Sequence, residues 1–477
     1  MADGGPGGHV DSIRQSGKSR TEQAILADSA GPSFIDTLTI TSNEEGRKKV
    51  SLLPGVVRIQ YWESLLQDCV KATVTYADGG NTIEKDGKKV SAREGLPIVG
   101  SETVDIKVTD NNKNTLILKM LVNKPAEIFT ESTKSLVRLD MAAMEYFTNE
   151  KVRIKTRMDG KISDHVRKIL KEDEKYLATE EHIYIEPTSN NYNFIGNNRK
   201  PYYVMNWLSK KSVSAKNQKQ GDSAGYFFYE TYNGFFFKSI DGLLAQEKKK
   251  SIIFNQSPDG RGQKTPKGYD LKALDFKKDN AVNVQNKLQM GAFSTRTVLF
   301  DPFSCYYEVI TPTAEQKKSS YKTAGKDLPV LNKEFEREGR NKEFSRTTYM
   351  LLDKGSLPTG SGTGKDQEQL KKATEENFQP KDILNQSIMR YGQLFAQKST
   401  ITIPGDFSLH AGDVIFLDSP ELKPDVKTDE VSKDSGGLYI IADLCHFISP
   451  KETYTKLNLV RDSFGRKGNH SSGSIPL

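Results

Sequence analysis

The stretch Gly437-Leu-Tyr-Ile-Ile-Ala-Asp-Leu-Cys-His-Phe-Ile448 decides the fold class of this 477-residue chain. Residues that are two apart share a face of an extended strand, and here both sets contain several apolar side chains. Such a segment is typical of a β-strand with one face in a core and the other face in a mixed environment. The first set is Leu438, Ile440, Ala442, Leu444 and Ile448, and the second is Tyr439, Ile441, Asp443, Cys445 and Phe447.

Three further extended segments surround this strand, at Ser399–Ile403, Gly412–Leu417 and Thr453–Arg461. Turn-forming or polar residues separate them, and none of the segments shows helical periodicity. The separators are Pro404-Gly405, Asp418–Ser435 and Ser449-Pro450. We therefore expect residues 396–465 to form most of a small antiparallel β-barrel.

A second β-rich region extends from Phe34 to Val122, with the same alternation of apolar and polar residues. It predicts five or six antiparallel strands, enough to close or nearly close another small barrel over residues 33–124. The turns are Asp78-Gly79-Gly80-Asn81 and Asp110–Asn114. The alternating apolar residues are Val57, Ile59, Tyr61, Val70, Ala72, Val74, Tyr76, Val104, Ile106, Val108, Leu116, Leu118, Met120 and Val122.

The pattern from Lys124 to Lys200 indicates helix, with Ser163 as an N-cap before apolar residues at helical spacing. We expect a middle α+β region over residues 125–221. The apolar segment Pro201–Leu208 predicts that Trp207 is buried beside Tyr203 and Leu208.

Asn233-Gly234 lies between two aromatic-rich runs, which predicts a β-hairpin within residues 222–245. The hairpin has aromatic side chains on both faces, so we expect it to pair with strands of 401–461 and to complete the second barrel. Residues 246–395 then form an insert. It has strands near Thr297–Phe300 and Tyr306–Ile310, a flexible loop at 354–377 and a helix at Gln379–Phe395. Residues 1–32 are expected to be a disordered extension and 466–477 a tail.

The composition excludes several classes of protein. Hydrophobic residues make up 35% and charged residues 27%, and 69 basic against 62 acidic residues leave a net charge of +7. That excess is too small at this length to indicate nucleic-acid binding by itself. No apolar run reaches the roughly 18 residues of a membrane span, and the first 32 residues lack the apolar core of a signal peptide, so we expect no membrane insertion and a cytosolic site of synthesis. Cys69, Cys305 and Cys445 have neither disulfide nor zinc spacing and are expected to be small apolar fillers.

No group of residues predicts a catalytic, cofactor or metal site. Asp443, Cys445 and His446 are close in sequence, but the cysteine and the histidine are adjacent strand residues and therefore point to opposite faces. His410 and Asp413 lie in a tight turn, where such residues are common. The other histidines, His9, His165, His182 and His470, are scattered without paired metal-ligand spacing.

Two phosphate or nucleic-acid signals are weak. Gly360–Asp366 lacks the first glycine and the Ser or Thr of a phosphate loop, which favours a flexible linker. The lysine runs at 248–250 and 317–318 lack interleaved aromatic residues, which favours solvated loops. A pair of acidic residues for glycoside hydrolysis stays open, since such pairs meet only in the folded chain.

From about Phe34 to Gly465 the chain resembles the baseplate central hub of T-even-type contractile phage tails, which is related to the base of type VI secretion spikes. The resemblance rests on segments at both ends and in the middle of the chain: Arg58–Leu66, Val70–Val74, Leu96–Ile106, Pro201–Leu208, Gly225–Leu243, Ile401–Ile415, Gly437–His446 and Thr455–Asp462. The N-terminal Gly-rich extension and the insertion Lys354–Asn377 have no counterpart in this pattern.

The resemblance implies a homotrimer in which each chain supplies two tail-tube-like barrels to a pseudo-sixfold ring. Such a hub joins the sixfold tail tube to the threefold central spike, contacts baseplate wedge proteins, and lets DNA pass without specific binding. It has no cofactor and is a structural component of the virion, made in the host cytoplasm. A tail-associated cell-wall hydrolase, and a soluble enzyme or carbohydrate-binding module, remain the alternatives from other classes.

Overall fold

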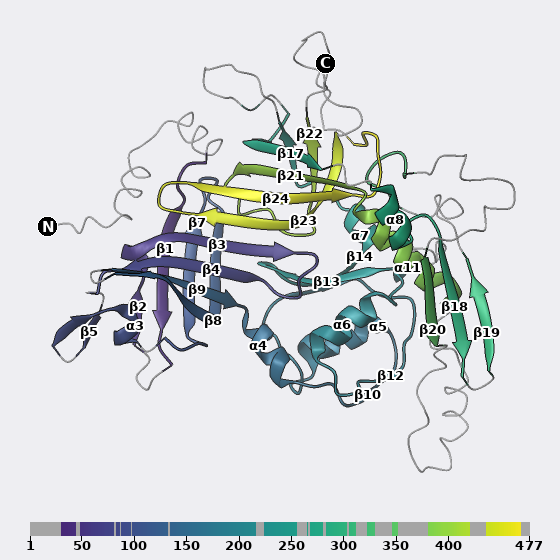
Figure 1. The fold of residues 1–477 in the computed structure, drawn as a ribbon, viewed down its shortest axis with the longest axis horizontal. Helices are drawn as coiled ribbons and strands as arrows, with labels where there is room; N and C mark the ends of the chain where they lie inside the picture. Colours follow the sequence, from purple (N-terminus) through teal and green to yellow (C-terminus); the bar gives the residue numbers. More distant parts are fainter. Residues whose placement is uncertain are drawn as a thin grey trace, which may run out of the picture.

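The long strand expected at Gly437–Ile448 lies in the middle of one large sheet in the computed structural model (Figure 1). The structure describes residues 30–43, 48–80, 83–85, 87–96, 98–131, 134–215, 224–254, 265, 268–279, 283–302, 305–311, 322–329, 346–351, 380–419 and 436–468. The protein is mainly β, as the alternation in the sequence predicts. The expectations for residues 1–29, for Lys354–Asn377 and for 469–477 lie outside these described residues.

The first half of the large sheet comes from the N-terminal region, where the predicted antiparallel strands are confirmed. Their order in space is β3-β4-β9-β8-β7-β1-β2. The inward side chains form one core, which contains Ile59, Tyr61, Val74, Ile106 and Leu118. The strands are β1 (Phe34–Thr41), β2 (Lys49–Ser51), β3 (Val56–Ser64), β4 (Lys71–Asp78), β7 (Thr103–Thr109), β8 (Thr115–Thr130) and β9 (Ser135–Ala142).

Smaller elements decorate this half of the sheet. A 3-10 turn separates β2 from β3, and a short hairpin and a one-turn helix precede β7. They are η1 (Leu53–Gly55), β5 (Ile83–Lys85), β6 (Lys88–Val90) and α3 (Ala92–Gly95).

The change to helix expected at Lys124 occurs only at Met144, so this prediction is wrong for the first twenty residues. β8 continues to Thr130, and β9 pairs with both β4 and β8. The apolar residues of β9 alternate as in a half-buried strand, with Val137, Leu139 and Met141 in the core. The boundary between the first β-region and the middle region is therefore later than residue 124.

The second half of the large sheet contains the four strands predicted in 399–461, all of which are confirmed. It also contains three short strands from the insert. Ile401, Ile403, Ile415, Leu444 and Leu457 belong to its core. The strands are β15 (Lys250–Ile253), β16 (Leu271–Lys272), β17 (Asp275–Asp279), β21 (Gln397–Pro404), β22 (Val414–Asp418), β23 (Gly437–Ile448) and β24 (Thr453–Arg461).

The predicted hairpin exists, but the prediction that it pairs with strands of 401–461 is wrong. β13 (Tyr226–Thr231) and β14 (Gly234–Ser239) pair with each other, and β14 pairs in parallel with β11 (Ile183–Ile185) of the middle region. Tyr226, Phe228, Phe235 and Phe237 face the core of the middle region. On the other face Phe227 and Tyr229 pack against side chains of β22, β23 and β24. The aromatic residues on both faces thus lie between two cores rather than inside one barrel.

The middle region places short helices below the hairpin (Figure 1). Residue Ser163 is not the N-cap of its helix, because the helix begins one residue earlier and Lys161 occupies the cap. The elements are α4 (Met144–Lys151), β10 (Arg157–Met158), α5 (Ile162–Arg167), the π-helical turn η2 (Lys168–Glu172), β12 (Phe194–Ile195), α6 (Pro201–Ser209) and α7 (Ile240–Leu244).

Trp207 is only half-buried, contrary to the prediction of full burial. Its ring meets Tyr192 and Phe194 edge to face, and Lys211 lies over it at 4.8 Å. Leu208 is fully buried, whereas Tyr203 is 52% exposed. The helix α6 therefore turns Leu208 into the core and Tyr203 away from it, because residues 203 and 208 are not on the same helical face.

The rest of the insert forms a separate three-stranded sheet at one side of the molecule (Figure 1). The predicted strands at Thr297–Phe300 and Tyr306–Ile310 and the helix near Gln379–Phe395 are confirmed. The elements are α8 (Val284–Met290), β18 (Thr295–Asp301), β19 (Tyr306–Ile310), β20 (Arg346–Leu351) and α11 (Pro380–Leu394). Among the helices of the described residues, none has the length and apolar character needed to cross a bilayer.

Candidate functional site

The two halves of the large sheet meet where β23 pairs antiparallel with β3. Asp443 is the backbone partner of Ser64, and the register continues to Ile448 and Ile59. Together with the flanking pairs, this junction creates one run of antiparallel strands in the order β17-β21-β24-β23-β3-β4-β9-β8. From β17 to β9 these strands run one below another in Figure 1. We treat the face of this run that points away from the cores as the candidate functional surface.

The candidate surface is polar and hydrogen-bonded across strands. Asp443 accepts hydrogen bonds from Ser64 and from Asn458 Nδ2, the latter at 3.3 Å, and Asn458 Oδ1 lies 3.0 Å from Thr400 Oγ1. This row of side chains crosses β3, β23, β24 and β21. Because the row spans the junction, it ties the two halves of the sheet together on the outer face.

A second polar group lies on the other side of β3. Arg138 makes a 3.0 Å ion pair with Asp140 on the same strand, and Asp140 also accepts a hydrogen bond from Thr73 at 3.4 Å. Arg58 donates to Thr75 at 3.5 Å. These two groups of described residues thus combine acidic and basic side chains with hydroxyl and amide groups, rather than carrying charge of one sign.

Behind the junction, Glu63 connects three segments that are far apart in the sequence. Its side chain is 1% exposed. One carboxylate oxygen accepts from the Tyr61 hydroxyl at 2.9 Å and from the Tyr232 N–H at 2.8 Å, and the other accepts from the Ala411 N–H at 2.9 Å. His410 Nδ1 lies 3.1 Å from the first oxygen. One buried carboxylate therefore fastens β3, the turn of the hairpin and the loop before β22.

Burial alone would raise the pKa of Glu63. The charge and hydrogen bond of His410, with the two backbone N–H groups, outweigh burial and lower the pKa of the carboxyl below its ordinary value of 4.5. The Tyr232 ring stacks on His410 at 6.0 Å between centroids. The charged carboxylate is thus the form that this environment stabilises.

The structure also locates the residues considered as chemical candidates. His410 contacts Glu63 through its ring, while Asp413 accepts from the His410 backbone N–H at 2.8 Å and from Lys249 at 2.9 Å. The signal for Glu63 was present in the sequence, since it follows Ile59 and Tyr61 in the inward register of β3. A carboxylate in that register does not by itself indicate a role, because its partners come from segments that are distant in the sequence.

Cys445 and His446 point to opposite faces, as adjacent strand residues must. Cys445 lies partly buried on the polar surface, where burial raises the pKa of its thiol to about 11. His446 is fully buried, donates to or accepts from Thr455 Oγ1 at 2.9 Å, and has its pKa lowered to about 4 by burial. The two groups share no site, and a protonated thiol is a poor nucleophile.

The remaining histidines and cysteines occupy separate places. His165 is buried with Nε2 2.8 Å from the Tyr192 carbonyl, and burial lowers its pKa. Cys69 is buried, but Cys305 is exposed, so the expectation that all three cysteines are apolar fillers is wrong for Cys305. His9 and His470 lie outside the described residues. Within the described part of the chain no three His, Cys, Asp or Glu side chains are grouped to hold a metal ion.

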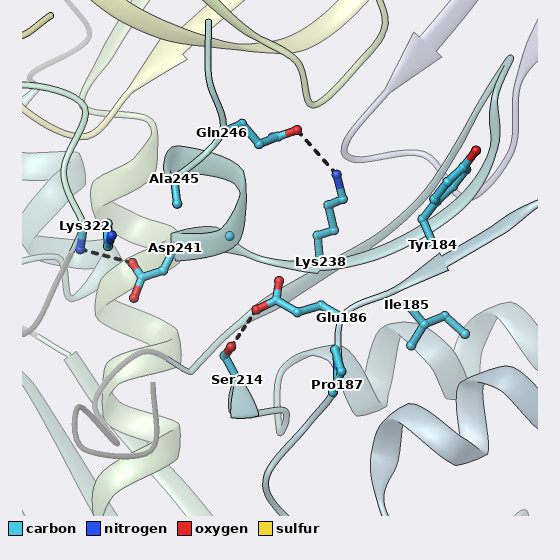
Figure 2. Close-up of a pocket in the computed structure, with 11 residues that line it drawn as sticks. Tyr184, Ile185, Glu186, Pro187, Ser214, Lys238, Asp241, Ala245, Gln246 and Lys322 are labelled. Atoms are coloured by element: carbon cyan, nitrogen blue, oxygen red, sulfur yellow. Dashed lines mark hydrogen bonds between the residues drawn. The ribbon is translucent and has the colours of Figure 1, made fainter. Parts of the chain in front are cut away.

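A pocket of about 610 Å³ lies between β11, the end of β14 and α7 (Figure 2). Glu186 lines it, but its carboxylate already accepts hydrogen bonds from Ser214 at 2.6 Å and from Ser239 at 2.9 Å. Asp241, on the opposite side, pairs with Arg390 at 3.1 Å. Both carboxylates of the pocket thus accept from protein donors, and Glu186 ties Ser239 at the end of the hairpin to Ser214. The weak phosphate-loop pattern at Gly360–Asp366 lies outside the described residues.

No family model matches the chain, and no curated protein matches it. Solved structures are similar to it over most of its length at low identity. A tail protein from Neisseria meningitidis MC58 has a TM-score of 0.47 and 8% identity, with 89% of this chain and 96% of that chain covered. A 43 kDa tail protein of prophage MuSo2 from Shewanella oneidensis has a TM-score of 0.47, 7% identity and coverages of 89% and 98%. An Escherichia coli component of the type VI secretion system has a TM-score of 0.38, 7% identity and coverages of 89% and 76%. All three TM-scores are below 0.5.

Proposed function

We propose that the protein is the central hub of a contractile phage tail baseplate, a homotrimeric structural adaptor between a sixfold tube and a threefold spike. Each chain supplies two tube-like barrel domains, one built on β1 to β9 and the other on β15 to β24. The middle region and the insert decorate this ring from outside. The protein acts by position and contact rather than by catalysis, and it resides in the virion.

The observation that carries the proposal is that the two halves of the large sheet have the same order of strands. The first half runs β1-β7-β8-β9-β4-β3, and the second runs β15-β22-β23-β24-β21-β17. The strands also match in their order along the chain. β1, β3, β4, β7, β8 and β9 correspond in turn to β15, β17, β21, β22, β23 and β24. One difference exists: β1 is antiparallel to β7, whereas β15 is parallel to β22.

Further contacts support closure of each half into a barrel. β16 pairs with β15, while the consecutive β17 pairs with β21, and the Leu274 N–H donates to Thr402 O at 2.7 Å. β2 and β3 bridge β1 and β4 in the same manner. Two consecutive strands that pair with opposite ends of a sheet cover the free edges of that sheet, which is the usual advantage of a barrel.

Two like barrels in one chain make three chains equivalent to six tube subunits. The run of eight strands described above would line the channel of such a trimer. Strands are spaced about 4.8 Å apart, so three runs give a circumference of at least ~115 Å and a channel wide enough for duplex DNA. The mixed polar surface fits a passage that DNA crosses without specific binding, with tube, spike and baseplate wedge proteins as the partners.

Light scattering tests the assembly. We expect the full-length chain, alone or mixed with the tube and spike proteins encoded with it, to show close to three times the 53.4 kDa chain mass. Negative-stain electron microscopy of the same sample should show rings. A monomer that persists with both partners present, or a twofold dimer, would refute the proposed hub. Release of soluble sugar from purified cell wall by the isolated protein would favour the hydrolase instead.

A further inference from the structure

The run of eight antiparallel strands ends on two strand edges that have no strand partner among the described residues. At one end β17 pairs only with β21. At the other end β8 pairs with β7 as far as Leu121, and Val122 still bonds to the backbone of Ser101 and Glu102; beyond Val122 its strand partner among the described residues is β9. The stretch 126–130 of β8 is thus an edge, and so is β17. Because directions alternate along the run, a β17 placed next to β8 would be antiparallel to it.

The chain already contains one junction of this kind. β23 and β8 have the same position in the two halves of the sheet, and each leads through a four-residue loop into the next strand, β24 or β9. In the first half β3 flanks β4, which pairs with β9. In the second half β17 flanks β21 in the same way, and β21 pairs with β24. β23 finds β3 within the same chain, whereas the equivalent strands β8 and β17 lie at opposite ends of the run.

We propose that β8 of one copy of this chain pairs with β17 of a second copy, in the register of the β23 and β3 junction. This inference rests on the proposed trimer, and it names the strand pair that holds the trimer together. A heterologous contact of this kind closes into a ring when the rotation between copies is one third of a turn. The three β23 and β3 junctions and the three β8 and β17 junctions then alternate around the ring.

The register follows from partners that the two halves share. In the second half Leu457 of β24 pairs with Ile401 of β21, and in the first half Leu139 of β9 pairs with Val74 of β4. We therefore take Leu457 and Leu139 as equivalent positions, and likewise Ile401 and Val74. Ile401 pairs with Phe276 as Val74 pairs with Ile59. Transferring the known pairs of β23 and β3 by these correspondences gives four pairs between copies: Thr130 with Phe276, Phe129 with Lys277, Glu127 with Lys278 and Ala126 with Asp279. Ile128 forms a bulge, as it does against β9.

The side chains at the two edges complement each other. Glu127 is exposed and comes opposite the exposed Lys278, and Phe129 comes opposite Lys277, where an ammonium group can lie over the ring. Ile128 and Phe129 are each 48% exposed. Exposed apolar side chains that lie next to each other are common at an interface. Pairing would cover them and satisfy the backbone groups of both edges.

Cysteine cross-linking tests the strand pair directly. Cys305 and Cys445 are first changed to Ser, and the buried Cys69 is kept. We expect Glu127→Cys with Lys278→Cys in one chain to give, on oxidation, covalent species that stop at three chains, because facing strand residues meet disulfide geometry. Neither single variant should cross-link. A covalent dimer from Glu127→Cys alone would indicate twofold pairing of β8 with β8 and would overturn the proposal.

Two matched controls define a positive and a negative result. Cys445 and Trp62 are backbone partners at the junction within the chain, so Trp62→Cys with native Cys445 should give an intrachain disulfide and no gain in mass. Ile117→Cys with Lys278→Cys should give no cross-link, although Ile117 is 62% exposed on the same strand. If the Ile117 pair links as well as the Glu127 pair, the contact is not this register.

A charge exchange gives a second readout that does not depend on oxidation. Glu127→Lys would place like charges across the junction and should weaken association at least ~tenfold, and Lys278→Glu alone should do the same. The double variant restores the pair and should recover the trimer. If the trimer forms but neither single change affects it, the strand assignment is wrong while the hub stands. If the unmodified chain never trimerises, the hub itself fails.

Discussion

Replacing Glu63 should loosen the junction between the two halves of the sheet. In Glu63→Ala the Tyr232 and Ala411 N–H groups, the Tyr61 hydroxyl and the His410 ring all lose their shared acceptor. Each buried donor left without a partner costs about 1–3 kcal/mol. Because water can enter the space that the side chain leaves, we expect a loss of about 3–5 kcal/mol in the free energy of unfolding rather than the full sum.

Glu63→Gln isolates the charge. The amide oxygen can still accept from Tyr61 and Tyr232, but its NH2 group would face the Ala411 N–H. Loss of one charge-assisted hydrogen bond gives an expected cost of about 1.5–3 kcal/mol. The folded-state pKa of Glu63 is lowered, so its contribution is present above pH 4.5 and is lost as the pH falls through the folded pKa. The difference between wild type and Glu63→Gln should therefore shrink as the pH falls below 4.5.

Urea denaturation followed by tryptophan fluorescence measures the free energy of unfolding. In a Cys305→Ser background, the rate at which Cys445 reacts with a thiol reagent measures how often the pairing of β23 with β3 opens. Glu102 is the matched control, since it is equally buried but accepts only from Val99 and Gly100 of its own turn. We expect Cys445 to react faster in Glu63→Ala and unchanged in Glu102→Ala. Equal reactivity in both, or a Glu63→Gln variant as stable as wild type, would show that Glu63 does not hold the junction.

Three other substitutions test the interior. Burial, and next the charge of the nearby Glu145, raises the pKa of Glu230 well above its ordinary value. The wild type therefore loses stability as the pH rises above 4.5. In thermal melts Glu230→Gln should be more stable than the wild type by on the order of 1 kcal/mol at pH 8 and by less at pH 5. Arg390→Met leaves Asp241 and Asp462 buried without their shared cation and should cost about 3–5 kcal/mol in urea denaturation, and Asp241→Asn in the same background should recover part of that loss. Trp207→Ala should cost about 3 kcal/mol, below the full cost of a buried ring because the side chain is half-buried, and light scattering should show the oligomer unchanged.

The strands were predictable where alternation and turns occur together. Gly437–Ile448 and Thr453–Arg461 have the predicted bounds because each is a long alternating run that ends at a turn. The partner of the hairpin was not predictable. Aromatic residues on both faces of Tyr226–Ser239 indicate burial on two sides, but they do not distinguish a place in a barrel from a place between two cores. The short β15, β16 and β17 were missed because strands of two to five residues carry too little periodicity to detect.

The candidate surface was harder to predict than the fold. Asp443, Asn458 and Thr400 are ordinary polar positions on three different strands, and only the strand order brings them into one row. Cys445 and His446 could be separated by strand geometry alone, since the argument needs just two adjacent residues. Glu63 needed partners from positions 232 and 411, whose proximity depends on how the hairpin docks.

The edges of the run favour pairing of unlike strands over pairing of like strands. Two antiparallel β17 strands in the register that sets Lys277 opposite Lys278 would bring like charges together, and so would two β8 strands centred on Glu127, which costs free energy at an interface. Pro125 and the bulge at Ile128 also break the flat edge that indiscriminate strand addition requires. In the proposed register the central Lys277 and Lys278 of β17, which lie between Asp275 and Asp279, come opposite Phe129 and Glu127 of β8. A twofold dimer of like edges covers only one of the two kinds of edge on each chain, whereas a closed ring of β8 and β17 pairs covers both.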